Sequence, residues 1–428
     1  MSSRLFQYEV LMDQSPIIVG AGIAGLVTAL ALAHKGIAST IFEKHKQLDA
    51  VGAGIQLTPN ATCILAHWGI LGKLTEVGTT PHFLELRDGV SLKTRLRADL
   101  LNLSEKNWKA PYITIHRADL QKVLYNAVVK NPFIKYKTGE AVVASTQTTT
   151  NSIHIKTIKT DVPTETQQPQ FYSTPLLIGC DGVWSTLRKL APFHETADFS
   201  GFIAWRAIKK FEHLPKGFRS LLQNVKTITA WMGPKNHLVV YPIQSSEKIF
   251  NFVAITHGEN SKEGWAHKGN KENLKSFFKD WNLQILQIFD HIDEWSYWPV
   301  FQMKQNRFLG LERQVFVGDC AHAALPFAAQ GAAMAIEDAA TLAETLSMKD
   351  LSLIEALSFY EKTRNPRVAA VKKRGDFNRI VYHATGPIAI ARNFVMKIRT
   401  SEAIMSSLDW LYSYNAMNLA KMKRSAVQ

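Results

Sequence analysis

The sequence is poor in cysteine. It has only three, Cys63, Cys180 and Cys320, and none of them stands in a Cys-x-x-Cys or Cys/His ligand spacing. We therefore expect neither a disulfide framework nor a zinc site, and we predict that the protein binds no metal. So few separated cysteines fit a reducing compartment, and a cytoplasmic location is expected.

Long apolar runs are also missing. The longest, such as "GLVTALALA" (25–33), falls well short of the roughly 18 residues that a membrane-spanning helix needs. Residues 1–15 include acidic side chains and have no apolar stretch of the kind found in secretory signals. We therefore predict no transmembrane segment and no secretion signal.

Acidic residues are outnumbered by basic ones. The chain has 50 Lys and Arg against 36 Asp and Glu, which gives a net charge of +14 over 428 residues. Residues 371–428 alone hold ten Lys and Arg against three Asp and Glu. Because no nucleic-acid motif accompanies this excess, we expect no nucleic-acid partner. Attraction of anionic substrates is favoured, and peripheral contact with a membrane surface stays open.

A glycine motif follows the first predicted strand. Gly20, Gly22 and Gly25 are spaced as G-x-G-x-x-G, and a helix is predicted over residues 23–35. In a dinucleotide site, the first glycine permits a tight turn, the second lets a pyrophosphate approach the backbone, and the third allows close packing. Glu43 ends the next strand, where a carboxylate can accept hydrogen bonds from a ribose. The motif does not separate FAD from NAD, and a glycine-rich junction without a ligand is the alternative.

Two further motifs lie downstream. "PLLIGCDGVWSTLRK" (175–189) is predicted to be a strand that ends at Asp181, and "VFVGDCAHAALPFAAQGAAMAIEDA" (315–339) a strand that ends at Asp319. After Asp319, residues 320–337 carry no charge until the last of them. A buried core helix and a backbone that lies against a ligand both explain such a stretch.

In this order, the three motifs resemble the single-component flavoprotein aromatic hydroxylases, the class of para-hydroxybenzoate hydroxylase. The salicylate hydroxylase and 3-hydroxybenzoate 6-hydroxylase branch is the most similar. The resemblance extends from Ser15 to Ala416 and includes five more segments: "VGAGIQLTPNA" (51–61), "FSGFIAWRAI" (199–208), "HLVVYPI" (237–243), "HATGPIAIARN" (383–393) and "SLDWLYSYN" (407–415).

The resemblance implies an α/β fold. We expect a Rossmann-like (GR2-type) FAD-binding domain with an inserted antiparallel β-sheet substrate domain and a C-terminal helical segment. The expected ranges are 12–190 and 300–375 for the two parts of the FAD-binding domain, 191–299 for the substrate domain, and 376–428 for the helical segment. Period-two alternation predicts strands within the substrate domain at residues 200–209, 227–233, 237–243 and 248–256.

The resemblance also implies which residues contact FAD. Asp319 is expected to bind the ribityl hydroxyls, and the backbone N–H groups of Gln330, Gly331 and Ala332 to face the pyrimidine edge of the flavin. Small uncharged residues let the backbone approach a flat ring and keep water away. A helix N-terminus there also favours the negative charge of reduced flavin.

Other FAD contacts are expected from scattered positions. Arg117 is expected to reach the cofactor, with a surface cap of its own helix as the alternative. Asp181 resembles the acid of a motif that supports both FAD and the passage of the nicotinamide cofactor. The remaining expected contacts are Ala24, Gly54 and Lys44, the last of which stands where arginine is frequent in the family.

The activity that the resemblance implies is FAD-dependent hydroxylation of an aromatic phenolic acid, such as salicylate or a hydroxybenzoate. NADH or NADPH reduces the flavin, O2 forms a flavin C4a-hydroperoxide, and one oxygen passes to the ring. No second G-x-G-x-x-G exists, which fits a reductant that docks transiently. The protein is expected to be a monomer or a homodimer.

Three residues are candidates for catalysis. Alternation along "HLVVYP" places His237 and Tyr241 on one face of a strand, and Arg206 lies on another predicted strand of the same sheet. A phenol needs a group that takes or orients its proton, and a carboxylate favours a nearby cation. For each residue, a hairpin hydrogen bond or a surface charge is the alternative.

Two other functions remain open at this point. The same fold could act on a quinone precursor or a polyene at a membrane surface, which liposome flotation would reveal. The chain could also be a flavin-binding protein without turnover, which NAD(P)H oxidation stimulated by a small aromatic compound would exclude.

Overall fold

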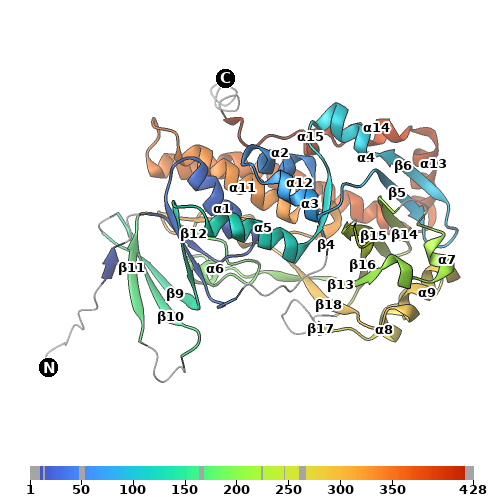
Figure 1. Cartoon of the computed structure of the whole chain (residues 1–428), viewed down its shortest axis with the longest axis horizontal. Helices are drawn as coiled ribbons and strands as arrows, with labels where there is room; N and C mark the ends of the chain where they lie inside the picture. Colours follow the sequence, from blue (N-terminus) through green and yellow to red (C-terminus); the bar gives the residue numbers. More distant parts are fainter. Residues whose placement is uncertain are drawn as a thin grey trace.

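The computed structural model describes residues 10–12, 15–47, 54–149, 151–162, 168–222, 225–244, 246–259 and 267–419. Of the segments that carry the family resemblance, residues 51–53 lie outside this range. A parallel sheet with its helices lies on one side of the molecule and a larger, mostly antiparallel sheet on the other (Figure 1). The α/β fold with an inserted sheet and a helical C-terminal segment is therefore confirmed.

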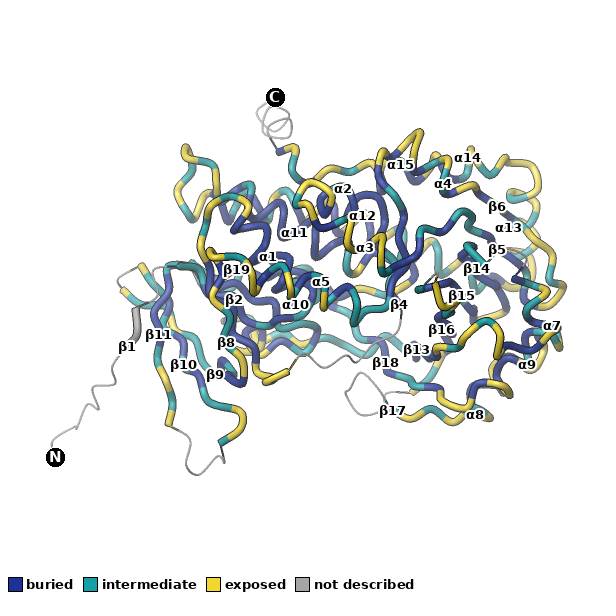
Figure 2. The backbone as a smooth tube through the Cα atoms, viewed as in Figure 1, coloured by how far each residue is buried: buried dark blue, intermediate teal, exposed yellow. Residues whose placement is uncertain are grey.

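The parallel sheet has five short strands. Four of them are buried at every position, as dark blue segments of Figure 2 show, whereas the edge strand that begins at Ile134 is buried only at that residue. In spatial order they are β19 (Gln314–Phe316), β12 (Leu177–Gly179), β2 (Ile17–Val19), β3 (Ser39–Glu43) and β8 (Ile134–Thr138). Because all neighbours are parallel, the carboxyl ends of β2, β12 and β19 meet at one edge. The three sequence motifs therefore converge there.

Helices cover this sheet and connect it to the rest of the chain. The long α11 (Gly331–Leu346) packs against α1 (Ile23–His34), which also contacts α5 (Arg117–Val129). Beside them lie α2 (Pro59–His67), α3 (Leu71–Val77), α6 (Thr186–Leu190), α10 (Asp319–His322), and the short pair β4 (Gly54–Leu57) and β7 (Ile113–His116). A four-stranded sheet flanks this part, in the order β1 (Val10–Met12), β11 (Gln170–Thr174), β10 (Ile153–Lys159) and β9 (Glu140–Gln147).

The second large sheet has eight strands. Their order is β17 (His267–Lys268), β18 (Ser296–Gln302), β13 (Asp198–Lys210), β16 (Ile249–His257), β15 (Asn236–Gln244), β14 (Thr227–Gly233), β5 (Phe83–Asp88) and β6 (Thr94–Asp99). The four strands predicted from alternation correspond to β13, β14, β15 and β16. However, β5 and β6 come from residues 83–99, so the sheet draws strands from outside the expected range 191–299.

One face of this sheet packs on its own aromatic core. Trp231, Phe250 and Phe252 are fully buried there, against Phe278 and Phe289. Covering this face are α7 (Lys216–Arg219), α8 (Lys271–Ser276) and α9 (Leu283–His291). The opposite face of the eight-stranded sheet faces the parallel sheet.

The last part of the chain is helical. It comprises α12 (Leu353–Tyr382), α13 (Gly386–Ile398), α14 (Ser401–Ser406) and α15 (Asp409–Tyr412). Four short helical elements lie elsewhere in the chain: α4 (Leu100–Leu103), Ser104–Trp108, Phe211–His213 and Pro326–Ala328. No helix within the described ranges is both long and apolar enough to cross a membrane.

A buried ion network holds α12 against α11. Arg364 donates to Glu337 and to Asp338 at 2.7 Å each, and Arg367 also pairs with Glu337 at 2.7 Å. Arg367 further donates to the backbone carbonyl of Leu411. Charges that are buried and fully paired fix the relative position of their elements, so this network anchors the helical segment to the parallel-sheet half.

Candidate active site

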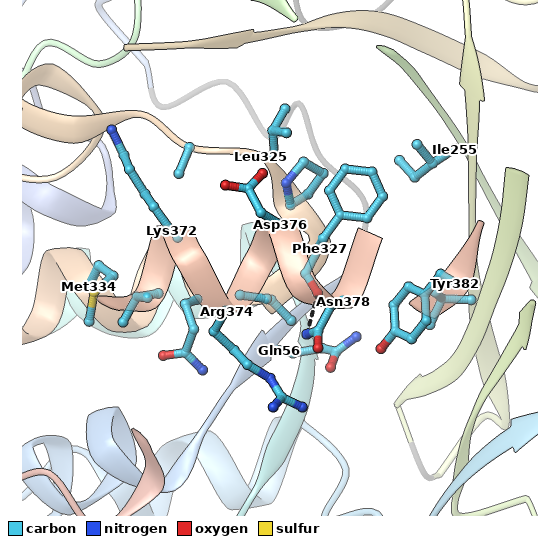
Figure 3. Close-up of a pocket in the computed structure, with 18 of the residues that line it drawn as sticks. Gln56, Ile255, Leu325, Phe327, Met334, Lys372, Arg374, Asp376, Asn378 and Tyr382 are labelled. Atoms are coloured by element: carbon cyan, nitrogen blue, oxygen red, sulfur yellow. Dashed lines mark hydrogen bonds between the residues drawn. The ribbon is translucent and has the colours of Figure 1, made fainter. Parts of the chain in front are cut away.

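A cavity of about 1050 Å³ lies between the two sheets. Gly22, Arg117 and Asp319 line one end of it, and Arg206, His237 and Tyr241 line the other. Side chains of α12, among them Lys372, Arg374 and Tyr382, are arranged along the cavity in Figure 3. Candidate residues as far apart in sequence as Gly22 and Asp319 thus line the same cavity. We call its two ends the cofactor end and the substrate end.

The glycine motif forms the turn that precedes α1. Gly20 has φ +100°, and a Cβ there would lie 2.7 Å from the carbonyl oxygen of Cys180. A Cβ on Gly25 would lie 1.8 Å from the carbonyl oxygen of Gly20, so no larger residue fits either position. Gly22, in contrast, caps α1 with open space beside it, and with Ala24 it lines the cavity. The helix N-terminus is therefore accessible to a phosphate.

Glu43 is held beside this turn. Its carboxylate accepts hydrogen bonds from the backbone N–H groups of Ala21 at 2.7 Å and His45 at 2.9 Å. Lys44 is exposed at the end of β3. Neither Glu43 nor Lys44 lines the cavity, so the contact of Glu43 with a ribose and the contact of Lys44 with FAD stay predictions.

Asp181 and Gly54 have structural partners. The Asp181 carboxylate accepts from the Ser185 hydroxyl at 2.6 Å and from the Leu187 backbone N–H at 3.1 Å, which stabilises the start of α6. The Gly54 N–H donates to Oδ1 of Asn251 at 2.7 Å, and a Cβ on Gly54 would lie 2.7 Å from the ring of Tyr241. Gly54 lines the cavity, whereas Asp181 does not.

Arg117 and Asp319 lie at the cofactor end. His116 provides the cap of α5, because its Nδ1 accepts from the Ala118 backbone N–H at 3.1 Å. The Arg117 side chain is thus not needed as a cap and lines the cavity instead. Burial lowers the pKa of Arg117, and the negative charge of Asp319 opposes that shift. Burial likewise lowers the pKa of Lys372 to about 8, and Asp319 opposes this shift too.

The N-terminus of α11 borders the same end. The side chain of Gln330 is tied to the α2 region, since it donates to Thr58 at 3.0 Å and accepts from Asn60 at 3.1 Å. Gly331 and Ala332 line the cavity, and Gly331 has open space where a Cβ would stand. The positive end of this helix therefore faces the hollow.

These features fit FAD. Two helix N-termini are open to the cavity, at Gly22 and Gly331, and can receive a diphosphate and an electron-rich ring edge. The carboxylate of Asp319 can accept from ribityl hydroxyls, and Arg117 supplies a cation nearby. Among the described residues, no group of His, Cys, Asp and Glu side chains is arranged to hold a metal ion.

The substrate end contains a cationic side chain, Arg206. Its guanidinium carbon lies 3.5 Å from the centre of the Trp298 ring. Its Nε is buried and has no hydrogen-bond partner in the described parts of the chain. Burial lowers the pKa of Arg206 to about 9, with Tyr241 opposing the shift and Arg117 adding to it. A cation this poorly compensated is expected to attract an anionic group.

His237 and Tyr241 lie on β15 with Val239 between them, and all three line the cavity. His237 is 3% exposed, and its Nδ1 is 2.8 Å from Nε2 of His383. Burial, aided by His383, holds the pKa of His237 well below its usual range, so the ring is neutral. Burial raises the pKa of Tyr241, although Arg206 and Gln56 oppose it, so the phenol keeps its proton. His237 is therefore the better proton acceptor of the two.

The sequence did not indicate His383 or Trp298. His383 is 146 positions from His237 and comes from the C-cap of α12, so no periodicity could have paired them. Its only signal was its place at the start of "HATGPIAIARN". Trp298 faces Arg206 because β18 pairs with β13, a pairing that the sequence left undetermined.

Comparison with known proteins settles the family. Residues 13–374 match the family described as FAD binding domain. The chain belongs to this family. It is 30% identical to a 3-hydroxybenzoate 6-hydroxylase of Klebsiella oxytoca over 402 residues, which cover 94% of this chain and 97% of that protein. It is also 30% identical to a 3-amino-4-hydroxybenzoate 2-monooxygenase of Streptomyces platensis, with 93% and 96% of the two chains covered.

Solved structures agree with this assignment at the level of the fold. A salicylate hydroxylase substrate complex superposes with a TM-score of 0.76 at 19% identity, covering 96% of this chain and 97% of the other. The resemblance drawn from the motifs is confirmed, as is FAD as the cofactor. The protein is an FAD-dependent monooxygenase of the aromatic hydroxylase type, and the two rival functions are not favoured.

Proposed function

We propose that the protein hydroxylates a phenolic acid, such as salicylate or a hydroxybenzoate, with O2 and with NADH or NADPH as transient reductant. The observation that carries this proposal is the substrate end of the cavity, where Arg206 with its unpartnered Nε shares the wall with a neutral His237. A carboxylate would compensate the arginine and a phenol would donate to the histidine. Relatives named for hydroxybenzoates support the same substrate class.

The residues of the substrate end then have distinct roles. Arg206, stacked on Trp298, binds and orients the carboxylate of the substrate. His237 accepts the phenolic proton on Nε2, so its Nδ1 carries the ring proton and donates to Nε2 of His383, and this hydrogen bond fixes the orientation of the ring. Tyr241 keeps its proton and holds the substrate by hydrogen bonding. FAD, when bound, supplies the oxygen transfer itself.

We assign FAD to the cofactor end. The residues proposed to hold it are those expected from the sequence: Gly20, Gly22, Ala24, Gly25, Glu43, Lys44, Gly54, Arg117, Asp181, Asp319, Gln330, Gly331 and Ala332. For Gly20, Gly25 and Asp181 the proposed contribution is to shape the site, because their own contacts are with the protein backbone and with α6. We further propose a cytoplasmic monomer or homodimer.

A substrate screen tests the proposal. Purified protein is mixed with NADH or NADPH and a panel of hydroxybenzoates, and both NAD(P)H oxidation and ring products are recorded. We expect at least one phenolic acid to stimulate oxidation and to gain one hydroxyl group. The matched phenol without its carboxylate should have a higher KM, since it leaves Arg206 uncompensated. Stimulation by no phenolic acid would contradict the proposal.

A further inference from the structure

The wall of the substrate end continues beyond the catalytic strand. Val239, between His237 and Tyr241 on β15, pairs with Ala230 on β14, and Ala230 pairs in turn with Leu86 on β5. Leu86 pairs with Leu96 on β6. Residues paired directly across a sheet share one face, and all four line the cavity. We call this part of the cavity, over β14, β5 and β6, the apolar arm.

The sheet side of the arm is entirely aliphatic. Besides Ala230, Leu86 and Leu96, it is lined by Ile228 and Leu84, which also pair with each other. Leu86, Leu96, Ile228 and Ala230 are each no more than 8% exposed. No charged side chain from these three strands lines the cavity, in contrast with β13 and β15, which contribute Arg206, His237 and Tyr241.

The C-terminal helices form the opposite wall. From α13, Ile388, Val395 and Met396 line the cavity, and α13 and α14 both contact β6. Polar residues on this wall also come from the helical segment; Arg392, for instance, donates to the carbonyl of Val381 at 2.9 Å. Ile388 is 58% exposed and Val395 is 45% exposed, and Figure 2 shows the helix segment as largely exposed. Apolar side chains that face a groove in this way are typical of a site for an apolar ligand.

The arm is long compared with one aromatic ring. Neighbouring strands are about 4.8 Å apart, so the three steps from β15 to β6 span roughly 14 Å. A phenolic acid that meets both Arg206 and His237 stays at the catalytic strands and does not cover Leu86 or Leu96. A polar group in the arm would lose its hydrogen bonds to water without replacement from the sheet.

We propose that the natural substrate is a phenolic acid with a hydrocarbon chain on its ring, and that the chain lies in the apolar arm. This inference rests on the proposed function and specifies its substrate class. The catalytic end recognises the acid and the phenol, while the arm recognises the chain by burial alone. Substrates with longer chains should therefore be preferred until the chain outgrows the arm.

The test uses the holoenzyme and a homologous series. Starting from the best phenolic acid of the screen, a methyl scan finds the ring carbon that best accepts a substituent, and n-alkyl chains of increasing length are then placed there. Each methylene should raise kcat/KM by about fourfold, and the gain should level off for long chains. Dissociation constants from the change in flavin absorbance should follow the same slope, independently of turnover.

Variants on α13 locate the chain. Ile388→Gln and Val395→Gln place a polar group on the wall of the arm at exposed positions, where folding is not threatened, and should flatten the dependence on chain length. Ile390→Gln is the matched control, because Ile390 is 71% exposed on the same helix and does not line the cavity. The control should keep the slope of the unmodified enzyme.

The outcomes separate the two proposals. If short acids are hydroxylated and chain length has no effect on kcat/KM or on binding, the arm assignment is wrong and the proposed function stands. If no phenolic acid is hydroxylated, the proposed function is wrong. If, in addition, the dissociation constants do not fall with increasing chain length, the assignment of the chain to the apolar arm is wrong as well. A slope that both wall variants leave unchanged would show that the chain lies elsewhere.

Discussion

The two ends of the cavity are built in different ways. The cofactor end is made by short segments that follow β2, β12 and β19, together with Arg117 and the N-terminus of α11. Its shape depends on backbone geometry, as at Gly20 with its φ of +100°. The substrate end is made by side chains that strand pairing and α12 bring together, such as Arg206, Trp298 and His383. A backbone-built site can hold the same cofactor in many sequences, whereas single substitutions can change what a side-chain-built site accepts.

The charged side chains near the two ends also differ, in whether they are paired with an opposite charge. Behind the cofactor end, Arg364, Glu337 and Asp338 are fully buried and mutually paired. At the substrate end, the buried Nε of Arg206 has no hydrogen-bond partner among the described residues. Paired buried charges stabilise a fixed arrangement, while a poorly compensated cation is suited to a ligand. Substitutions in the paired network should therefore lower the stability of the protein, whereas substitutions at the substrate end should lower its activity.

The largest effect is expected for His237→Ala at the substrate end. Loss of a general base typically lowers the rate by about 10²–10⁴, so ring hydroxylation should fall by that factor. The variant should keep its flavin and its melting temperature, and it should still oxidise NAD(P)H with release of hydrogen peroxide. Tyr241→Phe should have a smaller effect, because Tyr241 keeps its proton. Product formed per NAD(P)H consumed is the measurement, and normal coupling in His237→Ala would show that this residue is not the base.

The next effect concerns the stability of the cofactor end. Asp338→Asn leaves Arg364 and His322 without their full partner, which should lower the free energy of unfolding by about 3–5 kcal/mol. Denaturant unfolding of the variant measures the loss. Glu344→Gln, which breaks a less buried pair with Lys35, is the control and should cost much less. Equal losses in the two variants would remove the distinction between the buried network and ordinary pairs.

Asp319→Ala should weaken the binding of FAD without changing the substrate end. Removing a charge-assisted hydrogen bond costs about 1.5–3 kcal/mol of binding free energy, which an equilibrium titration of apoprotein with FAD detects. Asp319→Asn keeps an acceptor and should lose less. Unchanged FAD affinity in the alanine variant would mean that Asp319 does not contact the cofactor.

The smallest effect is a pH dependence at Arg206. Since its pKa is about 9, the guanidinium is charged below that pH and loses its proton as the pH rises through it. KM for a phenolic acid should therefore rise above about pH 9, by up to tenfold per pH unit. KM for the matched phenol without a carboxylate should not follow this curve. If KM depends on pH in the same way for both compounds, Arg206 does not bind the carboxylate.

The contrast between the two ends also explains what the sequence could predict. The glycine turn and the four strands β13 to β16 were predictable because spacing and alternation act over a few residues. The apolar arm could not be predicted from the sequence, because it depends on the parallel pairing of β5 with β14, which are separated by about 140 positions. The contacts of the Asp181 carboxylate with the start of α6 were likewise not predictable from its motif, and its part in the FAD site stays a prediction.

Oxygen-isotope labelling tests the central claim most directly. The holoenzyme is supplied with oxygen-18 gas, NAD(P)H and the best phenolic acid from the screen, and the product is analysed by mass spectrometry. We predict one labelled oxygen on the ring for each NAD(P)H consumed. A hydroxylated product without the label, or complete loss of the reducing equivalents as hydrogen peroxide, would contradict the assignment of this cavity to aromatic hydroxylation.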